Sequence, residues 1–195
     1  APDVVALQAA DENQKRSGNI FQAEVLAQQL HMQFSYTPAL ENQGARYGNA
    51  ILSRYPLNLM EVLPLPHTAK AQELRNTQIV EIQHPRESLT LLNTHLGLRR
   101  KERRKQAGFI AEWILKWREI HPSSPLILCG DLNEGPRLNG NLGALFSALA
   151  WSSAAALPGG VRPTFPSPRP FRKLDYILSI GPLRVTGEGP YRSGL

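Results

Sequence analysis

The chain has 195 residues, a length that fits one large domain. Because 42% of the residues are hydrophobic and 19% are charged, the composition excludes a disordered chain. No apolar run approaches the roughly 18 residues of a transmembrane helix. Lys and Arg outnumber Asp and Glu by 22 to 16, and the resulting net charge of +6 favours anionic partners. A single cysteine, Cys129, excludes an internal disulfide framework and a Cys-rich zinc site.

The first half of the chain is expected to form one helix and several short strands. Apolar residues at helical spacing predict a helix over residues 20–30, with Asn19 as its N-cap. Residues 38–47 lack a periodic pattern and are expected to form a loop. The predicted strands cover residues 4–7, 33–36, 49–53 and 57–63, each an apolar run bounded by turn residues.

The second half begins with two neighbouring strands, residues 77–82 and 89–94, which are expected to pair antiparallel. Residues 99–120 predict the longest helix, because apolar residues recur at i, i+3, i+4 and i+7. Further strands are predicted at residues 126–129, 176–178 and 183–185, a short helix at 141–150 and a loop at 157–172. With no internal repeat and no linker, residues 1–195 are predicted to form a single α+β domain whose helices cover a sheet core.

Polar residues follow several of the predicted apolar strands, where a rigid strand end suits a functional site. His95 ends one such strand, and Asp131 and Asn133 follow another. Asp131 and Asn133 are two residues apart, so on an extended chain their side chains point the same way. A carboxylate there can activate a water while an amide donates to a phosphoryl oxygen, and a histidine can stabilise phosphate charge or transfer a proton.

Five segments, taken in order, resemble the endonuclease/exonuclease/phosphatase superfamily, which comprises the DNase I-like metal-dependent phosphodiesterases and phosphatases. They are Leu7-Gln8, Tyr47-Gly48-Asn49-Ala50-Ile51-Leu52-Ser53-Arg54, Asn93-Thr94-His95-Leu96, Gly130-Asp131-Leu132-Asn133 and Leu174-Asp175-Tyr176-Ile177. The resemblance extends from Asp3 to about Ile180. It implies a four-layer α/β sandwich in which two packed, mostly antiparallel sheets are flanked by helices.

The resemblance also implies roles for individual residues. Asp131 matches the carboxylate that orients or deprotonates the attacking water, and His95 matches a histidine near the scissile phosphate. Asn133 matches the asparagine that holds the phosphate, and Asp131 and Asn133 together are the implied metal-binding residues. Asp175 matches an aspartate that orients a C-terminal catalytic histidine, and Asn49 matches a polar residue near the substrate that supports His95. The implied cofactor is Mg²⁺ or Mn²⁺, hard cations that take oxygen ligands.

The sequence departs from the family's pattern at its first motif. That motif normally reads Leu-Gln-Glu and its Glu is the principal metal ligand, whereas Ala9 follows Gln8 here. Asp11 or Glu12 would have to supply the missing carboxylate. The strand that precedes this motif in the family and the closing Ser-Asp-His motif are not found, so the domain is expected to be truncated at both ends and to lack terminal strands.

Six basic residues open the long predicted helix, shortly after His95: Arg99, Arg100, Lys101, Arg103, Arg104 and Lys105. A solvated helix face is the ordinary interpretation of such a charge run. Cations are unfavourable at a helix N-terminus unless an anion compensates them, which favours a phosphate-contacting patch in which Arg99 and Arg103 bind substrate. Such a patch would attract a nucleic acid or an anionic lipid surface in a salt-sensitive way.

The sequence therefore predicts a divalent-metal-dependent phosphoric ester hydrolase, either nuclease-like or acting on a phospholipid headgroup or a small phosphate ester. The alternative is a catalytically impaired module that kept the fold and binds phosphate or polyanions, for which Ala9 is the main support. A third possibility is that Ala9 replaces a natural Glu, in which case Ala9→Glu should restore metal binding. No export leader is visible and Cys129 is compatible with an intracellular location, while the oligomeric state stays open.

Overall fold

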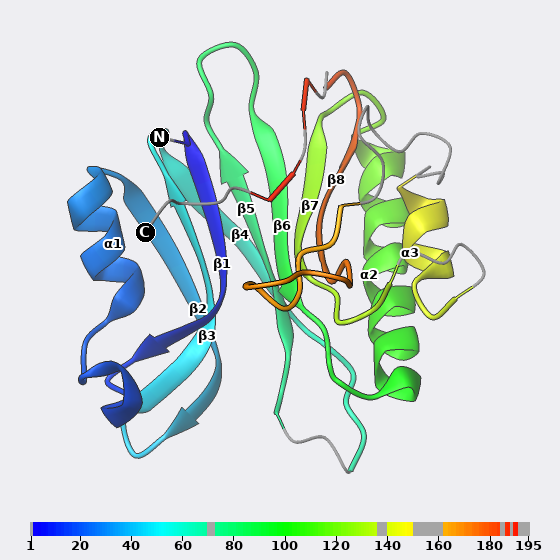
Figure 1. The fold of residues 1–195 in the computed structure, drawn as a ribbon. Helices are drawn as coiled ribbons and strands as arrows, with labels where there is room; N and C mark the ends of the chain where they lie inside the picture. The colour runs from blue at the N-terminus through cyan, green and yellow to red at the C-terminus, as the bar shows by residue number, and fades with distance from the viewer. Residues whose placement is uncertain are drawn as a thin grey trace.

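Two β-sheets pack face to face in the computed structural model, which describes residues 2–69, 73–135, 140–149, 162–183, 186–187 and 189–190. Helix α1 covers the outer face of one sheet, and α2 and α3 cover the outer face of the other (Figure 1). This arrangement confirms the four-layer α+β sandwich that the resemblance implied. None of the helices in these ranges is long and apolar enough to cross a membrane.

The first sheet has the strand order β1-β3-β2 and is antiparallel. Its strands are β1 (Val4–Glu12), β2 (Gln33–Asn42) and β3 (Ala45–Ser53). Residues 38–47 therefore form most of a hairpin, and the loop expected there is wrong. The sequence lacks the usual strand pattern here because β2 is an edge strand. Its polar side chains face water, and Pro38 is tolerated beside a register shift.

Helix α1 (Gln22–Leu30) follows a short 3₁₀ helix, Lys15–Ser17, and packs Ala23 and Ala27 against the first sheet. Its N-cap is Phe21 and not Asn19, which has a positive φ of 56°. The helix begins later than expected because Phe21 forms a β-bridge with Glu12, which keeps the chain extended up to that residue.

The second sheet has the order β4-β5-β6-β7-β8. Its strands are β4 (Leu57–Pro64), β5 (Asn76–Ile82), β6 (Leu89–His95), β7 (Leu126–Asp131) and β8 (Asp175–Ile180). The β5–β6 pair is antiparallel, as predicted, and β6 and β7 are parallel. A strand was expected over residues 183–185. Leu183 lies in a turn in which its N–H donates to the Gly181 carbonyl, so it is not part of a strand. The other two positions lie outside the described residues.

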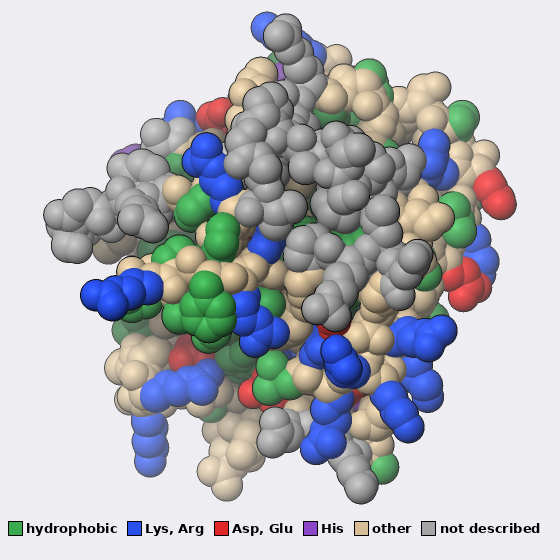
Figure 2. Space-filling model, turned by 45° about the vertical axis from the view of Figure 1, so that its right-hand side comes forward, with side chains coloured by type: hydrophobic (Ala, Val, Ile, Leu, Met, Phe, Trp, Pro, Cys, Tyr) green, Lys and Arg blue, Asp and Glu red, His purple; other side chains and the backbone are tan. Residues whose placement is uncertain are grey.

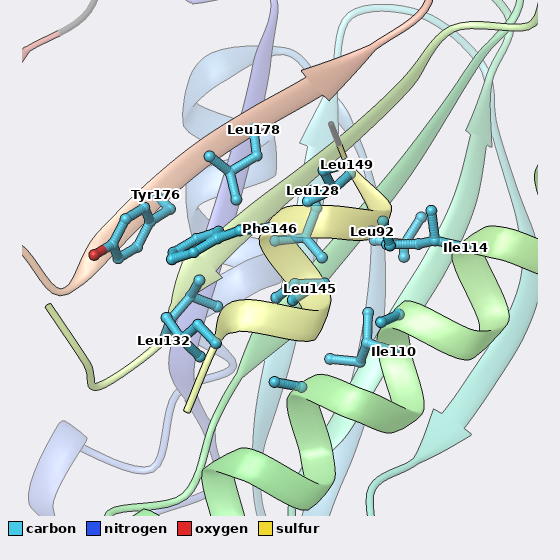
Figure 3. Close-up of a cluster of buried hydrophobic side chains, with 14 of the residues drawn as sticks. Leu92, Ile110, Ile114, Leu128, Leu132, Leu145, Phe146, Leu149, Tyr176 and Leu178 are labelled. Atoms are coloured by element: carbon cyan, nitrogen blue, oxygen red, sulfur yellow. The ribbon is translucent and has the colours of Figure 1, made fainter. Parts of the chain in front are cut away.

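Helices α2 (Arg100–Ile120) and α3 (Gly143–Ala148) bury one face of the second sheet. The predicted apolar stripe of α2 is confirmed, because Ile110 and Ile114 are fully buried among the side chains drawn in Figure 3. Phe146 of α3 packs against Tyr176 of β8 with ring centroids 5.9 Å apart. The parallel β6–β7 connection runs through α2, so packing on this helix fixes where both strands end.

A third apolar cluster lies between the two sheets and includes Ile51, Val80, Leu91 and Cys129. Burial raises the pKa of the Cys129 thiol to about 12, so this cysteine serves as a core side chain and not as a nucleophile. The β6 and β7 strands are thus packed on both faces, which makes their ends rigid supports for polar side chains.

Candidate active site

Three of the predicted site residues, His95, Asp131 and Asp175, lie in one row at an edge of the second sheet. His95 pairs with Asp131 in the register of the parallel strands β6 and β7. Asp131 pairs in turn with Asp175, the first residue of the antiparallel strand β8. Strand register alone therefore brings together residues that are 80 positions apart in the sequence.

Glycine is required immediately before Asp131. Gly130 has a φ of 149°, and a Cβ at this position would lie 1.8 Å from the carbonyl oxygen of Thr94 on β6. The backbones of β6 and β7 can approach this closely only because residue 130 has no side chain. The Gly-Asp pair in the sequence thus has a structural reason, which is to set Asp131 beside His95.

The His95 ring is enclosed, with 13% of its side chain exposed, and its two nitrogens face different groups. Nε2 lies 3.7 Å from Oδ2 of Asp131, and Nδ1 lies 3.3 Å from Nη1 of Arg75. Burial, reinforced by the Arg75 charge, lowers the pKa of His95 to about 4. His95 is therefore a neutral imidazole near pH 7.

Arg75 is a site residue that the sequence prediction missed. Its side chain is 5% exposed and forms an ion pair with Glu73 at 2.7 Å. Arg75 directly precedes β5, and Thr77 of β5 pairs with Thr94 of β6, so the start of β5 lies beside the end of β6. The antiparallel pairing predicted for these two strands was the signal that could have placed Arg75 near His95.

Asp131 and Asn133 are joined by a tight turn. The Asn133 backbone N–H donates to Oδ1 of Asp131 at 2.8 Å, and Asn133 has a positive φ of 52°. One amide hydrogen of the Asn133 side chain is donated to the Leu96 carbonyl at 2.8 Å, which fixes that side chain beside the end of β6. The turn therefore holds the Asn133 amide on the same edge as the Asp131 carboxylate.

The environment of Asp131 favours its protonated form relative to water. Burial raises the pKa of Asp131, although the hydrogen bond from Asn133 lowers it, and the nearby charge of Asp175 raises it further. A carboxylate with a raised pKa is a stronger base than an ordinary aspartate, which suits proton abstraction from water.

Buried polar side chains between the two sheets support the edge that carries His95 and Asp131. Asn93 on β6 donates to the carbonyls of Leu7 and Ala50 and accepts a hydrogen bond of 2.7 Å from Gln8. Asn49, predicted as a substrate contact and a support of His95, is 3% exposed and donates to the side chain and carbonyl of Asn76.

Asn49 thus lies beneath the site and does not reach its surface. Asn76 follows Arg75 in the chain, and Arg75 contacts His95, so Asn49 connects to His95 through two intervening residues. This is consistent with a supporting role and leaves the predicted substrate contact without a geometric basis.

Arg103 is buried on the inner face of α2, although the basic run in the sequence predicts that it binds substrate. Its guanidinium donates to Glu134 at 2.7 Å and to the carbonyls of Gly97 and Leu98. Burial raises the pKa of Glu134, but hydrogen bonds from Asn141 and Arg103 outweigh it and leave that pKa below its usual value. Arg103 therefore connects the start of α2 to the loop after β7. It is buried because its position falls on the stripe of α2 that faces the sheet.

The other basic residues of the run face solvent. Arg99 is the exposed N-cap of α2 and shares a small cavity with Arg75 and Glu73. Arg100, Lys101, Arg104 and Lys105 are exposed on the first turns of the helix. In Figure 2, Lys and Arg side chains gather on the lower part of the visible face, at the height where α2 begins in Figure 1. A positively charged surface thus adjoins the His95 edge.

The residues present do not make a complete site for the implied divalent cation. Within the described part of the chain, no three His, Cys, Asp or Glu side chains form a group able to hold a metal ion. Asp11 and Glu12, the acids nearest Ala9, form ion pairs with Arg16 and Arg46. Mg²⁺ demands six oxygen ligands in near-octahedral geometry, and an alanine methyl at position 9 supplies none.

A cavity of about 750 Å³ opens between β1 and the β7–β8 edge. Gln8, Gly130 and Asp175 line it together with apolar side chains such as Ile127 and Ile177. Asp175 also pairs with Asp131, so the cavity adjoins the row of site residues. Thr164 accepts a hydrogen bond of 3.2 Å from the Asp175 backbone, which anchors the 162–173 segment at the cavity wall.

The sequence is similar to a family model and to known proteins. The model of the endonuclease/exonuclease/phosphatase family matches residues 1–195. The uncharacterized protein YbhP of Escherichia coli is 29% identical over 113 residues, which are 57% of this chain and 43% of that protein, so the chain matches less than half of this relative's length.

Three solved structures share the fold. The human Nocturnin catalytic domain is 21% identical with a TM-score of 0.60, covering 91% of this chain and 69% of that one. Truncated TDP2 of Caenorhabditis elegans is 19% identical with a TM-score of 0.62, over 93% and 72% of the two chains. An endonuclease/exonuclease/phosphatase of Bacteroides vulgatus is 15% identical with a TM-score of 0.62, over 91% and 72%. The chain belongs to the endonuclease/exonuclease/phosphatase family.

Proposed function

We propose that this chain is a phosphoric ester hydrolase whose reaction takes place at the edge formed by His95, Asp131 and Asp175. The observation that carries the proposal is the strand register, which aligns these three residues across β6, β7 and β8. Membership of the endonuclease/exonuclease/phosphatase family supports the same reaction class.

The proposed reaction is the attack of a water molecule on phosphorus. Asp131 orients the water and accepts its proton, a new phosphorus–oxygen bond forms, and the bond from phosphorus to the leaving oxygen breaks. The Asn133 amide and the His95 ring contact the phosphoryl oxygens, whose negative charge increases in the transition state. The raised pKa of Asp131 and the fixed side chain of Asn133 support these assignments.

The role of a divalent cation is a separate part of the proposal. The family resemblance implies Mg²⁺ or Mn²⁺ with Asp131 and Asn133 as ligands, and Asp175 is the further carboxylate beside them. Because Ala9 provides no ligand, we assign no step to a metal. We expect that Ala9→Glu would add the missing carboxylate and strengthen the binding of Mn²⁺.

The substrate is proposed to carry a strongly anionic group. Arg99 lines a small cavity together with Arg75, which contacts His95, and further exposed basic residues follow on the first turns of α2. Such charges raise the local concentration of a polyanion and make its association salt-dependent. A nucleic acid and an anionic lipid both meet this description.

A second candidate function is phosphate or polyanion binding without turnover. Ala9 favours it, because a methyl group replaces the expected ligand while the basic surface is kept. This function predicts salt-dependent affinity for a polyanion and no product formation. Charge reversal of Lys101 and Arg104 would then weaken binding without affecting any catalytic rate.

The proposal is tested by hydrolysis of bis(p-nitrophenyl) phosphate and p-nitrophenyl phosphate, a diester and a monoester, with Mg²⁺ or Mn²⁺. The chain is compared with Ala9→Glu, and Mn²⁺ binding to both is measured by calorimetry. Turnover by either protein supports the hydrolase, and tighter Mn²⁺ binding by Ala9→Glu supports the metal assignment. If neither protein hydrolyses either ester, the hydrolase proposal is overturned and the binding module is favoured.

A further inference from the structure

The contact between Arg75 and His95 restricts where the His95 ring can carry its hydrogen. Nη1 of Arg75 lies 3.3 Å from Nδ1 of His95. A guanidinium has N–H donors and no acceptor, and it does not lose its charge in proteins. A hydrogen on Nδ1 would therefore point at another hydrogen, so Nδ1 must present its lone pair to Arg75.

Arg75 is held firmly in the position from which it makes this contact. Its Nη2 pairs with Glu73 at 2.7 Å, and 5% of its side chain is exposed. Within the described residues, Nε of Arg75 and Oε1 of Glu102 are both buried and have no hydrogen-bond partner. Both residues line a cavity of about 20 Å³, a volume sufficient for one water molecule.

The other ring nitrogen faces the row of site residues. Nε2 of His95 lies 3.7 Å from Oδ2 of Asp131, too far for a direct hydrogen bond. We propose that Arg75 is a positioning residue that fixes the tautomer of His95, with the ring hydrogen on Nε2. The fixed tautomer would direct the Nε2–H of His95 at a phosphoryl oxygen of the substrate. This purpose rests on the proposed function.

The assignment gives His95 one role among the two that the sequence allowed. With the lone pair of Nδ1 directed at Arg75, the ring carries its hydrogen on Nε2 and donates it from there. The ring thus stabilises charge by a fixed hydrogen bond, as donors in oxyanion holes do.

The test is ¹⁵N nuclear magnetic resonance of the chain labelled at its histidines, recorded near neutral pH. Protonated and unprotonated ring nitrogens differ strongly in chemical shift, and two-bond couplings to the ring hydrogens tell Nδ1 from Nε2. The His95 signals are identified by their loss in His95→Asn. The wild-type ring is expected to show the hydrogen on Nε2 alone.

Three arginine variants separate the tautomer effect from a general structural effect. Arg75→Met removes the donor and is expected to release the preference, so that the Nδ1–H form also becomes populated. Arg75→Lys keeps a cationic donor and is expected to retain the wild-type pattern. Arg54→Met, at an exposed arginine, is the matched control and should leave His95 unchanged.

Two results would overturn the inference: a hydrogen on Nδ1 in the wild-type protein, or a folded Arg75→Met variant with an unchanged His95 spectrum. If Arg75→Met does not fold, the wild-type spectrum and Arg75→Lys still decide the question. The spectrum does not depend on turnover. If the hydrolysis assay fails, the proposed function is overturned, but the tautomer assignment is still decided by the nuclear magnetic resonance data.

Discussion

His95 and Asp131 lie opposite each other at the ends of the parallel strands β6 and β7, with Nε2 of the imidazole 3.7 Å from Oδ2 of the carboxylate. The two groups have opposite pKa displacements, downward for His95 and upward for Asp131, and burial is the largest cause of both. Each displacement makes the charged form of the group less favourable than it is in water. Two consequences can be measured, one in stability and one in activity.

Folding stability is expected to fall as the pH drops from about 6.5 towards about 4, because the unfolded state protonates His95 before the folded state does. The loss from this group amounts to at most about 3 kcal/mol. The raised pKa of Asp131 offsets part of it at the acidic end, since the folded state takes up that proton first.

Urea unfolding at about pH 7 and about pH 4.5 measures this effect. His95→Asn should lose less stability between the two pH values than the wild type does. His31→Asn is the control, because His31 is exposed at the end of α1 in a left-handed conformation that asparagine accepts. Equal pH dependence in His95→Asn and the wild type would contradict the prediction.

Gly130→Ala is expected to destabilise the fold by more than about 3 kcal/mol, because the new Cβ would meet the Thr94 carbonyl and force β6 and β7 apart. Gly108→Ala is the matched control. Gly108 lies within α2 with open space around it, and alanine there should stabilise the helix by about 0.5–1 kcal/mol. Thermal unfolding of the two variants compares them directly, and similar stabilities would show that the close approach at Gly130 is not required.

Arg103→Met is expected to cost about 3–5 kcal/mol of stability, because it leaves the buried Glu134 carboxylate without its cationic partner. Arg104→Met, one residue along but exposed, should change stability by less than about 0.5 kcal/mol. Chemical denaturation distinguishes the two variants. If Arg103→Met keeps wild-type stability and only weakens binding of a polyanion, the substrate role predicted from the sequence holds and the structural role does not.

Much of the candidate site could be predicted from the sequence because it follows from strand ends. His95 and Asp131 each close an apolar run, and the long helix between the runs implies a crossover, which makes the two strands parallel neighbours and places both residues at one edge. Asn133 follows because its spacing from Asp131 fits a tight turn. These inferences use only alternation and connection length.

The remaining features depend on tertiary packing, which the sequence pattern does not encode. Arg75 lies in a stretch without periodicity, and the predicted antiparallel pairing of β5 and β6 indicates its neighbourhood but not its contact with His95. Arg103 lies in line with the apolar stripe of α2, but a run of like charges is typical of a solvated helix face, so its burial was not predicted. The outer half of the β2–β3 hairpin, with Pro38 in it, was missed because an edge strand with polar side chains reads as a loop.

The measurement that tests the central claim most directly is the rate at which wild type and Asp131→Asn hydrolyse the p-nitrophenyl esters under identical conditions, with Asp3→Asn at an exposed carboxylate as the control. The account predicts that Asp131→Asn folds normally and loses roughly 10²–10⁴-fold in kcat/KM, the contribution expected of a general base, while Asp3→Asn keeps the wild-type rate. Wild-type kcat/KM in a folded Asp131→Asn variant would contradict the assignment of hydrolysis to this edge of the sheet.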